Sequence, residues 1–124
     1  MTTLRTRRLI LRPFEDADRA AFAALNADTE VMAEFPAVLT RAQSDALIDF
    51  SEAKRANTGF GFSAVTTHDG QFLGMCGLSA PGFPAPFMPC VEIGWRLARS
   101  AWGNGYASEA ARAWLAYGFD ALGL

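Results

Sequence analysis

Two glycines in the last quarter of the chain constrain its fold more than any other feature. Gly103 and Gly105 form a Gly-x-Gly turn between a predicted strand, residues 90–97, and a strongly periodic helix, residues 107–122. A helix start presents backbone N–H groups without intrahelical partners, with the positive end of the helix dipole behind them. Because glycine has no side chain, a ligand can approach this backbone closely. The pattern predicts a strand–turn–helix unit that binds a phosphate or pyrophosphate group.

The composition limits the class of protein. The chain has 124 residues, of which 51% are hydrophobic, and this is enough for one core but not two. Eleven basic against 13 acidic side chains give a formal net charge of −2, which argues against a nucleic-acid partner. No apolar run reaches the roughly 20 residues that cross a bilayer, and Leu9-Ile10-Leu11 is too short for a signal peptide. We expect a single cytoplasmic domain, residues 1–124, without a membrane partner.

Cysteine and histidine indicate no special chemistry. Cys76 and Cys90 lie in apolar, strand-like runs, which favours buried reduced thiols over a disulfide or a nucleophile. His68 stands in an Asp-Gly turn without a second histidine or a partner at metal-ligand spacing. We expect no metal.

Hydrophobic periodicity predicts an α+β (or α/β) arrangement with a mainly antiparallel sheet. The predicted strands are residues 4–12, 60–64, 71–78 and 90–97, with a hairpin turn at His68-Asp69-Gly70. Asp16 is the expected N-cap of a helix that buries Phe22 and Leu25. Thr40 and Gln43 form a capping box. The helix that follows this capping box is expected to bury Ala46, Leu47, Phe50 and Ala53. The last helix, residues 107–122, is expected to bury Ala107, Ala110, Ala111, Trp114, Leu115, Gly118 and Leu122.

A proline-rich segment, residues 81–89, interrupts the sheet. Four prolines in nine residues exclude regular secondary structure, so the segment is predicted to be an ordered or semi-rigid loop. Its apolar side chains are Phe83, Phe87 and Met88. They either line a substrate (acceptor) pocket, cover the sheet or form a dimer contact.

Three stretches, taken in order, carry a family resemblance. They are TRRLILRPF at residues 6–14, VEIGW at 91–95 and WGNGYASEA at 102–110. With this order of elements, the chain resembles the GNAT superfamily of acetyl-CoA-dependent N-acetyltransferases, most closely its branch of ribosomal-protein N-terminal acetyltransferase-like (RimJ/RimL-like) proteins. The resemblance implies the GNAT fold, here as its N-terminal two-thirds without the C-terminal β-α-β part.

The resemblance also implies where the co-substrate acetyl-CoA binds. The pyrophosphate would lie on the loop and helix start, formed by Trp102, Gly103, Asn104, Gly105, Tyr106 and Ala107. The pantetheine arm would contact the preceding strand, at Ile93, Trp95, Arg96 and Leu97. The superfamily pattern is Gln/Arg-x-x-Gly-x-Gly/Ala, and Trp102 occupies the Gln/Arg position, as is usual for this branch.

The implied reaction is acetylation of a primary amine, either a protein N-terminal amine or a small-molecule amine. A free amine with a pKa near about 10 is mostly protonated at neutral pH, so a base must remove its proton. Glu92 is the first candidate for this base, and the alternative is a strand carboxylate that faces solvent or pairs with an arginine such as Arg96. Direct attack in a ternary complex is expected, because no activated Cys or Ser is evident.

Two other functions remain open. One is a non-catalytic acyl-CoA-binding module, and the other is a nucleotide-phosphate binder that uses the same glycine-rich helix start. The absence of a Gly-Lys-Ser/Thr motif and of G-x-G-x-x-G counts against the second. A strand that normally follows such a helix is missing from the sequence, so we expect an exposed strand edge at residues 90–97 that favours a homodimer.

Overall fold

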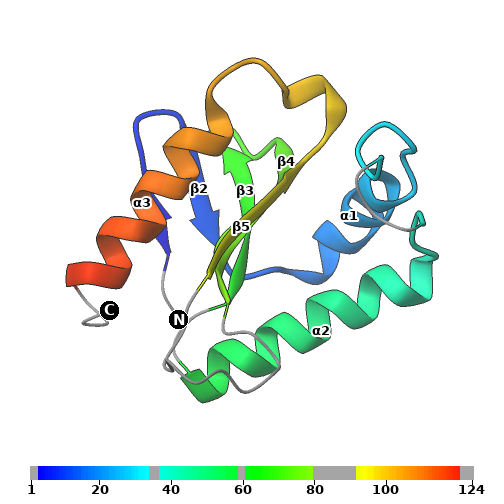
Figure 1. Ribbon diagram of the computed structural model, residues 1–124, viewed down its shortest axis with the longest axis horizontal. Helices are drawn as coiled ribbons and strands as arrows, with labels where there is room; N and C mark the ends of the chain where they lie inside the picture. The colour runs from blue at the N-terminus through cyan, green and yellow to red at the C-terminus, as the bar shows by residue number, and fades with distance from the viewer. Residues whose placement is uncertain (1–2, 34–36, 59–60, 80–91, 121–124) are drawn as a thin grey trace.

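The computed structural model describes residues 3–33, 37–58, 61–79 and 92–120 (Figure 1). The strands are β1 (Leu4–Arg5), β2 (Leu9–Arg12), β3 (Phe62–Thr67), β4 (Phe72–Ser79) and β5 (Glu92–Leu97). The helices are α1 (Arg19–Asn26), α2 (Arg41–Thr58) and α3 (Tyr106–Asp120), with 3₁₀ turns η1 (Asp16–Asp18) and η2 (Arg99–Ala101). Phe83, Phe87, Met88 and Cys90 lie outside the described residues.

The described strands form one sheet in the order β1-β2-β3-β4-β5, and every neighbouring pair is antiparallel. The expected mainly antiparallel sheet is therefore confirmed. The prediction of one strand over residues 4–12 is wrong, because β1 and β2 form a tight hairpin in which Leu4 pairs with Leu11. The Thr6 hydroxyl accepts a hydrogen bond from the Leu9 N–H at 3.0 Å, which stabilises the turn between them.

The helices cover both faces of the sheet. α3 lies on one face, and α1 and α2 lie on the other (Figure 1). Each face has its own apolar core. The α3 core is Leu9, Leu11, Val65, Leu73, Cys76, Leu97, Ala101, Ala110 and Trp114, and the α1/α2 core is Phe22, Leu25, Val31, Met32, Ile48 and Met75.

The first helix begins later than the sequence suggests. Residues Asp16–Asp18 form η1, and α1 begins only at Arg19. Asp18 is 4% exposed, and its carboxylate accepts hydrogen bonds from the Glu15 N–H at 2.7 Å and from two Arg12 nitrogens at 2.7 and 2.9 Å. The hydrogen bond to Asp18 raises the pKa of Arg12. Asp18 therefore anchors the entry to α1 onto β2.

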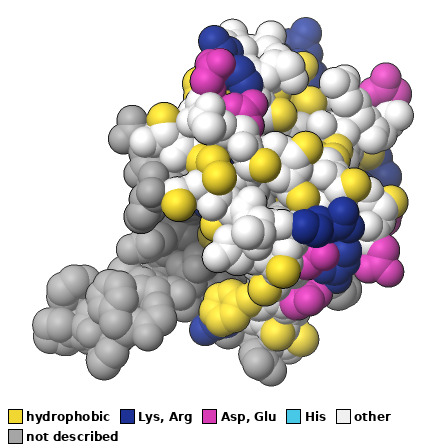
Figure 2. Space-filling model, turned by 90° about the vertical axis from the view of Figure 1, so that its right-hand side faces the viewer, with side chains coloured by type: hydrophobic (Ala, Val, Ile, Leu, Met, Phe, Trp, Pro, Cys, Tyr) yellow, Lys and Arg dark blue, Asp and Glu magenta, His cyan; other side chains and the backbone are white. Residues whose placement is uncertain are grey.

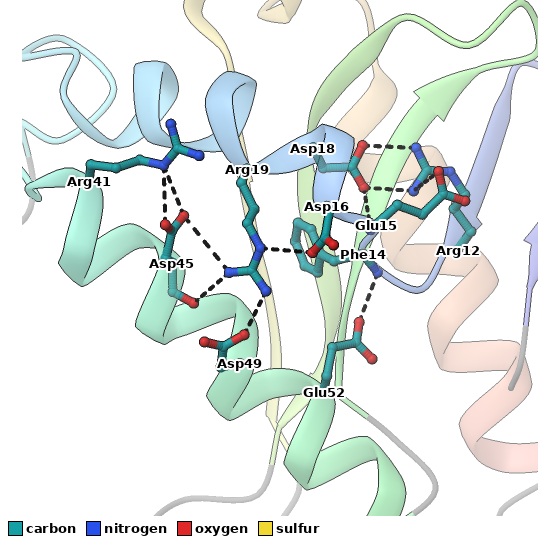
Figure 3. Close-up of polar contacts among 10 residues, drawn as sticks. All are labelled: Arg12, Phe14, Glu15, Asp16, Asp18, Arg19, Arg41, Asp45, Asp49 and Glu52. Carbon is teal, nitrogen blue, oxygen red and sulfur yellow. Dashed lines mark hydrogen bonds and ion pairs between the residues drawn. The ribbon is translucent and has the colours of Figure 1, made fainter.

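Ion pairs and hydrogen bonds hold α1, α2 and the end of β2 together (Figure 3). Arg19 of α1 pairs with Asp49 of α2 at 2.7 Å and donates to the Asp45 carbonyl at 3.3 Å. Glu52 of α2 accepts the Phe14 N–H at 2.8 Å. Basic and acidic side chains also lie next to one another on the face shown in Figure 2. Among the described side chains on this face, the two signs of charge are therefore interspersed.

α2 buries a different face from the one that its apolar residues suggest. The capping box is confirmed by hydrogen bonds between Thr40 and Gln43, but Phe50 is 60% exposed. Ser51 accepts the Phe62 N–H at 2.9 Å, and Arg55 donates to the Phe62 carbonyl. The helix thus satisfies the polar groups at the start of β3. Its buried residues are Ser44, Ile48, Ser51 and Arg55.

α3 packs mainly as its periodicity predicts. Ala110 and Trp114 are fully buried, and the Trp114 indole N–H donates to the Ser63 hydroxyl at 3.1 Å. Leu115 is 41% exposed, so its placement in the apolar stripe is wrong. α3 is therefore firmly attached to the sheet, and this fixes its N-terminal end beside the end of β5.

Candidate functional site

The C-terminal end of β5 leads through one 3₁₀ turn and a short loop into the start of α3 (Figure 1). Leu97 ends the strand, η2 makes one turn, and four residues, 102–105, connect it to the helix. The Gly105 carbonyl accepts the Glu109 N–H at 3.1 Å, which is the first hydrogen bond of the helix. The N–H groups of Tyr106, Ala107 and Ser108 precede this first bonded donor. The helix start can therefore bind an anion.

Both glycines of this loop adopt a backbone conformation that favours glycine. The φ angles are +79° at Gly103 and +77° at Gly105. A residue with a Cβ pays roughly 1–2 kcal/mol to adopt this left-handed conformation. The two glycines therefore let the loop curve back toward α3 without strain.

Two side chains of the loop donate hydrogen bonds to nearby backbone carbonyls. The Trp102 indole N–H donates to the Leu97 carbonyl at 3.0 Å, which ties the loop to the strand end. The Asn104 amide donates to the carbonyls of Ala101 and Trp102 at 3.0 and 3.2 Å. Trp102 also lies against the Arg99 guanidinium, 4.7 Å from ring centroid to Cζ. Both side chains therefore hold the backbone of this loop in place.

A cavity of about 280 Å³ opens between β5, the loop and the first turn of α3. Seven of the ten residues predicted to bind the cofactor line it, and two more, Ala101 and Ser108, were not anticipated. Both exposed tryptophans of the region are among them, with exposures of 53% and 42%. The seven predicted residues are Trp95, Leu97, Trp102, Gly103, Gly105, Tyr106 and Ala107.

Other predicted site residues lie elsewhere. Arg96 turns to the α1/α2 side of the sheet, where its Nη1 donates to the Asn26 Oδ1 at 2.6 Å, and burial lowers its pKa. Glu92 pairs with Ser79 in the β4–β5 ladder, and Ile93 pairs with Leu78. The structure gives the backbone of Glu92 and Ile93 but not the surroundings of their side chains. The proposed acceptor-pocket residues lie outside the described residues.

The strand end approaches β4 unusually closely at Gly74. Gly74 pairs with Leu97 and has a φ of +152°, beside a register irregularity between Val65 and Thr66. A Cβ at Gly74 would lie 2.1 Å from the Arg96 carbonyl oxygen. Glycine is therefore required here for β5 to reach the position from which it leads into the loop.

A polar cluster that local sequence patterns do not reveal holds the β1–β2 turn against α3. The Glu109 carboxylate accepts hydrogen bonds from the Thr6 hydroxyl, the Arg8 N–H (2.9 Å) and the Arg8 Nε (2.7 Å). Burial alone would raise the pKa of Glu109, but these hydrogen bonds and the charge of Arg8 outweigh it and lower the pKa to about 2. The Arg8 guanidinium also lies over the Tyr106 ring, 4.6 Å from its centroid.

Within the described ranges, no group of three or more His, Cys, Asp or Glu side chains is arranged to hold a metal ion. None of the helices in those ranges has both the length and the apolar character that a bilayer span requires. Burial raises the pKa of the Cys76 thiol to about 12.

The described part of the chain is thus an antiparallel sheet covered by helices on both faces, with a glycine-rich helix start beside the end of β5. The model of the acetyltransferase (GNAT) domain matches residues 8–124, and the chain therefore belongs to this family. It is 38% identical over 123 residues to the uncharacterized protein YkkB of Bacillus subtilis (strain 168), covering 96% of this chain and 69% of that protein.

Solved structures have the same fold. An acetyltransferase from Agrobacterium tumefaciens strain C58 is similar with a TM-score of 0.83 and 30% identity, over 100% of this chain and 70% of that one. RimL, a ribosomal L7/L12 α-N-protein acetyltransferase in complex with coenzyme A, shares the fold with a TM-score of 0.74 and 15% identity, over 94% of this chain and 67% of that one.

Proposed function

We propose that this chain binds acetyl-CoA in the cavity between β5 and α3 and serves the transfer of its acetyl group to a primary amine. The observation that carries the proposal is the loop of the cavity, where Gly103 and Gly105 at positive φ precede the first bonded N–H of α3. Such a helix start favours a pyrophosphate. Membership of the GNAT acetyltransferase family and the coenzyme A complex of the RimL structure support the choice of ligand.

The pantetheine arm would run from the loop along β5, past Leu97 and Trp95, which line the same cavity. The amine nitrogen would attack the thioester carbonyl carbon, and the C–S bond would break to release the thiolate of coenzyme A. The amine must lose a proton, and Glu92 is the base that we propose for this step. Backbone N–H groups of β5 would stabilise the oxyanion.

Direct transfer without a covalent acyl-enzyme is consistent with the state of Cys76. A thiol with a pKa of about 12 stays protonated at neutral pH, and the thiolate is the reactive nucleophile. Cys76 is also fully buried in the α3 core. The acceptor in this proposal is either a protein N-terminal amine or a small-molecule amine, and the location is the cytoplasm.

Calorimetric titration of acetyl-CoA tests the proposal. Gly105→Trp fills the cavity and should weaken binding more than about tenfold, which corresponds to about 1.4 kcal/mol. Gly70→Trp is the matched control, since Gly70 also has a positive φ (+94°) but lies in open space at the β3–β4 turn. A folded wild-type chain that does not bind acetyl-CoA would refute the proposed function.

The transfer step needs a second assay. Release of the coenzyme A thiol should be measured with peptides that carry free N-terminal amines and with a panel of small amines. Glu92→Gln should lower the rate while leaving acetyl-CoA affinity within about twofold. Binding without thiol release in the presence of every amine would favour a non-catalytic acyl-CoA-binding module.

We also propose that β5 mediates dimerisation. Among the described strands only β4 pairs with β5, so its other edge has no partner strand there. Unpaired strand edges favour pairing with a second chain. Sedimentation that shows only monomer at high protein concentration would contradict this part of the proposal.

A further inference from the structure

A second cavity, about 650 Å³ in volume, lies on the other side of the α3 start. Its walls come from the β1–β2 turn and from the first two turns of α3, which Figure 1 shows side by side. It shares Gly105 and Ser108 with the cavity at the end of β5. The two cavities are therefore neighbours across the helix start. A ligand bound at the Gly103–Gly105 loop would therefore lie next to the second cavity.

The second cavity is basic although the whole chain is slightly acidic. Three arginines, Arg7, Arg8 and Arg112, line it together with one carboxylate, Glu109. The formal net charge of the chain is −2, so this positive excess is local. Glu109 accepts three hydrogen bonds from Arg8 and Thr6, and its charge is thereby offset by the arginine that it holds.

The hydrogen bonds of Arg8 fix its orientation. Its Nε is bound to Glu109, and its guanidinium lies over Tyr106. Its Nη2 lies beside the loop, since a Cβ at Gly105 would be 3.4 Å from this nitrogen. A guanidinium held in this way presents its remaining N–H groups as a preformed binding site for an oxyanion. The Arg112 Nε donates to the carbonyl of Ser108, one turn earlier in α3, at 3.3 Å.

We propose that this basic cavity binds a phosphomonoester, the 3′-phosphate on the ribose of coenzyme A. The inference rests on the proposed function, because it requires the pyrophosphate of the same molecule on the Gly103–Gly105 loop. A phosphomonoester carries about −1.5 to −2 charges at neutral pH, and arginines bind such a group through charge-assisted hydrogen bonds. Arg7, Arg8 and Arg112 would therefore discriminate between coenzyme A and its 3′-dephospho form.

The test compares acetyl-CoA with acetyl-3′-dephospho-CoA by calorimetry. The wild-type chain should bind acetyl-CoA about tenfold more tightly. The double variant Arg7→Gln/Arg112→Gln should reduce this ratio to about one, with the affinity for the dephospho ligand changed by less than about twofold. Arg41→Gln is the control, because it removes an exposed arginine of α2 whose partner is Asp45. It should leave the ratio unchanged.

Each outcome separates the two proposals. Equal affinity of the wild-type chain for both ligands would overturn the 3′-phosphate assignment and leave the proposed function intact. Absence of binding to either ligand by the folded chain would overturn the proposed function. Inorganic phosphate that competes with acetyl-CoA but not with its dephospho form would support the assignment. Phosphate that binds without weakening acetyl-CoA binding would assign the cavity to free phosphate and overturn the inference.

Discussion

The structure makes a definite prediction for the Glu109→Gln variant. In the wild-type chain, the Glu109 carboxylate accepts three hydrogen bonds from the β1–β2 turn. A neutral amide keeps one oxygen acceptor, loses the charge and places an NH₂ group against a donor. Hydrogen bonds to a charged group each contribute about 1.5–3 kcal/mol when buried. Arg8 is 42% exposed, so solvent screening reduces the ionic part.

We therefore expect the variant to lose about 2 kcal/mol of unfolding free energy near neutral pH. For a chain of this length, about 1 kcal/mol corresponds to roughly 4 °C in Tm, so the expected fall is roughly 8 °C. The matched control is Glu30→Gln. Glu30 pairs with Arg99 at 2.9 Å, but both side chains are more than half exposed, and removing this pair should change stability by less than about 1 kcal/mol.

The pH dependence gives an independent check. The pKa of Glu109 is lowered from 4.5 to about 2 in the folded chain, so its carboxylate stabilises the fold above pH 4.5. This stabilisation is lost as the pH falls from 4.5 toward about 2. Urea unfolding of the wild-type chain and of Glu109→Gln should be measured near pH 7, about pH 4 and about pH 3. The difference between their unfolding free energies should become smaller as the pH falls. A stability difference that stays constant over this pH range, or one no larger than that caused by Glu30→Gln, would contradict this role of Glu109.

Three further predictions concern the loop, the strand and the core. Trp102→Phe loses the hydrogen bond to the Leu97 carbonyl but keeps an aromatic ring. Tm should therefore fall by about 2–4 °C and acetyl-CoA affinity by about two- to fivefold. An unchanged affinity would show that binding does not depend on this hydrogen bond. Gly74→Ala places a Cβ 2.1 Å from the Arg96 carbonyl oxygen. Thermal unfolding should therefore show that the free energy of unfolding falls by more than about 3 kcal/mol. A fall of less than about 1 kcal/mol would mean that β5 can move away from β4 at little cost. Burial and a pKa of about 12 should keep Cys76 unreactive toward iodoacetamide near pH 8 until the chain unfolds. Rapid modification of the folded chain, detected by mass spectrometry, would contradict the burial of this thiol.

The parts that the sequence predicts well are those set by local backbone chemistry. The Gly103–Gly105 turn is such a case, because the positive φ of a glycine and the start of α3 depend on neighbouring residues. The capping box of α2 depends on Thr40 and Gln43, which are three positions apart. The same holds for the hairpin turn at Gly70, whose φ of +94° suits glycine.

The parts that the sequence does not reveal depend on residues that are distant along the chain. The buried face of α2 is an example, since Arg55 is 5% exposed and donates to the Phe62 carbonyl at the start of β3. A count of apolar residues places Phe50 on the inner face instead. The direction of a polar side chain is set by the orphan backbone groups that it can reach, and these become known only once the sheet and the helix are docked.

The same limitation applies to the electrostatics of the proposed binding site. Read along the chain, Glu109 is a carboxylate in the first turn of a helix whose start should bind an anion, and it would weaken that binding by repulsion. In the folded chain the carboxylate is bound to Arg8, 101 residues away, and this pairing orients the guanidinium beside Gly105. Arg7 and Arg112 add positive charge on the same cavity wall. Glu109 therefore orients a cation beside the helix start, and the charge of Arg8 offsets the repulsion that the position of Glu109 in the sequence suggests.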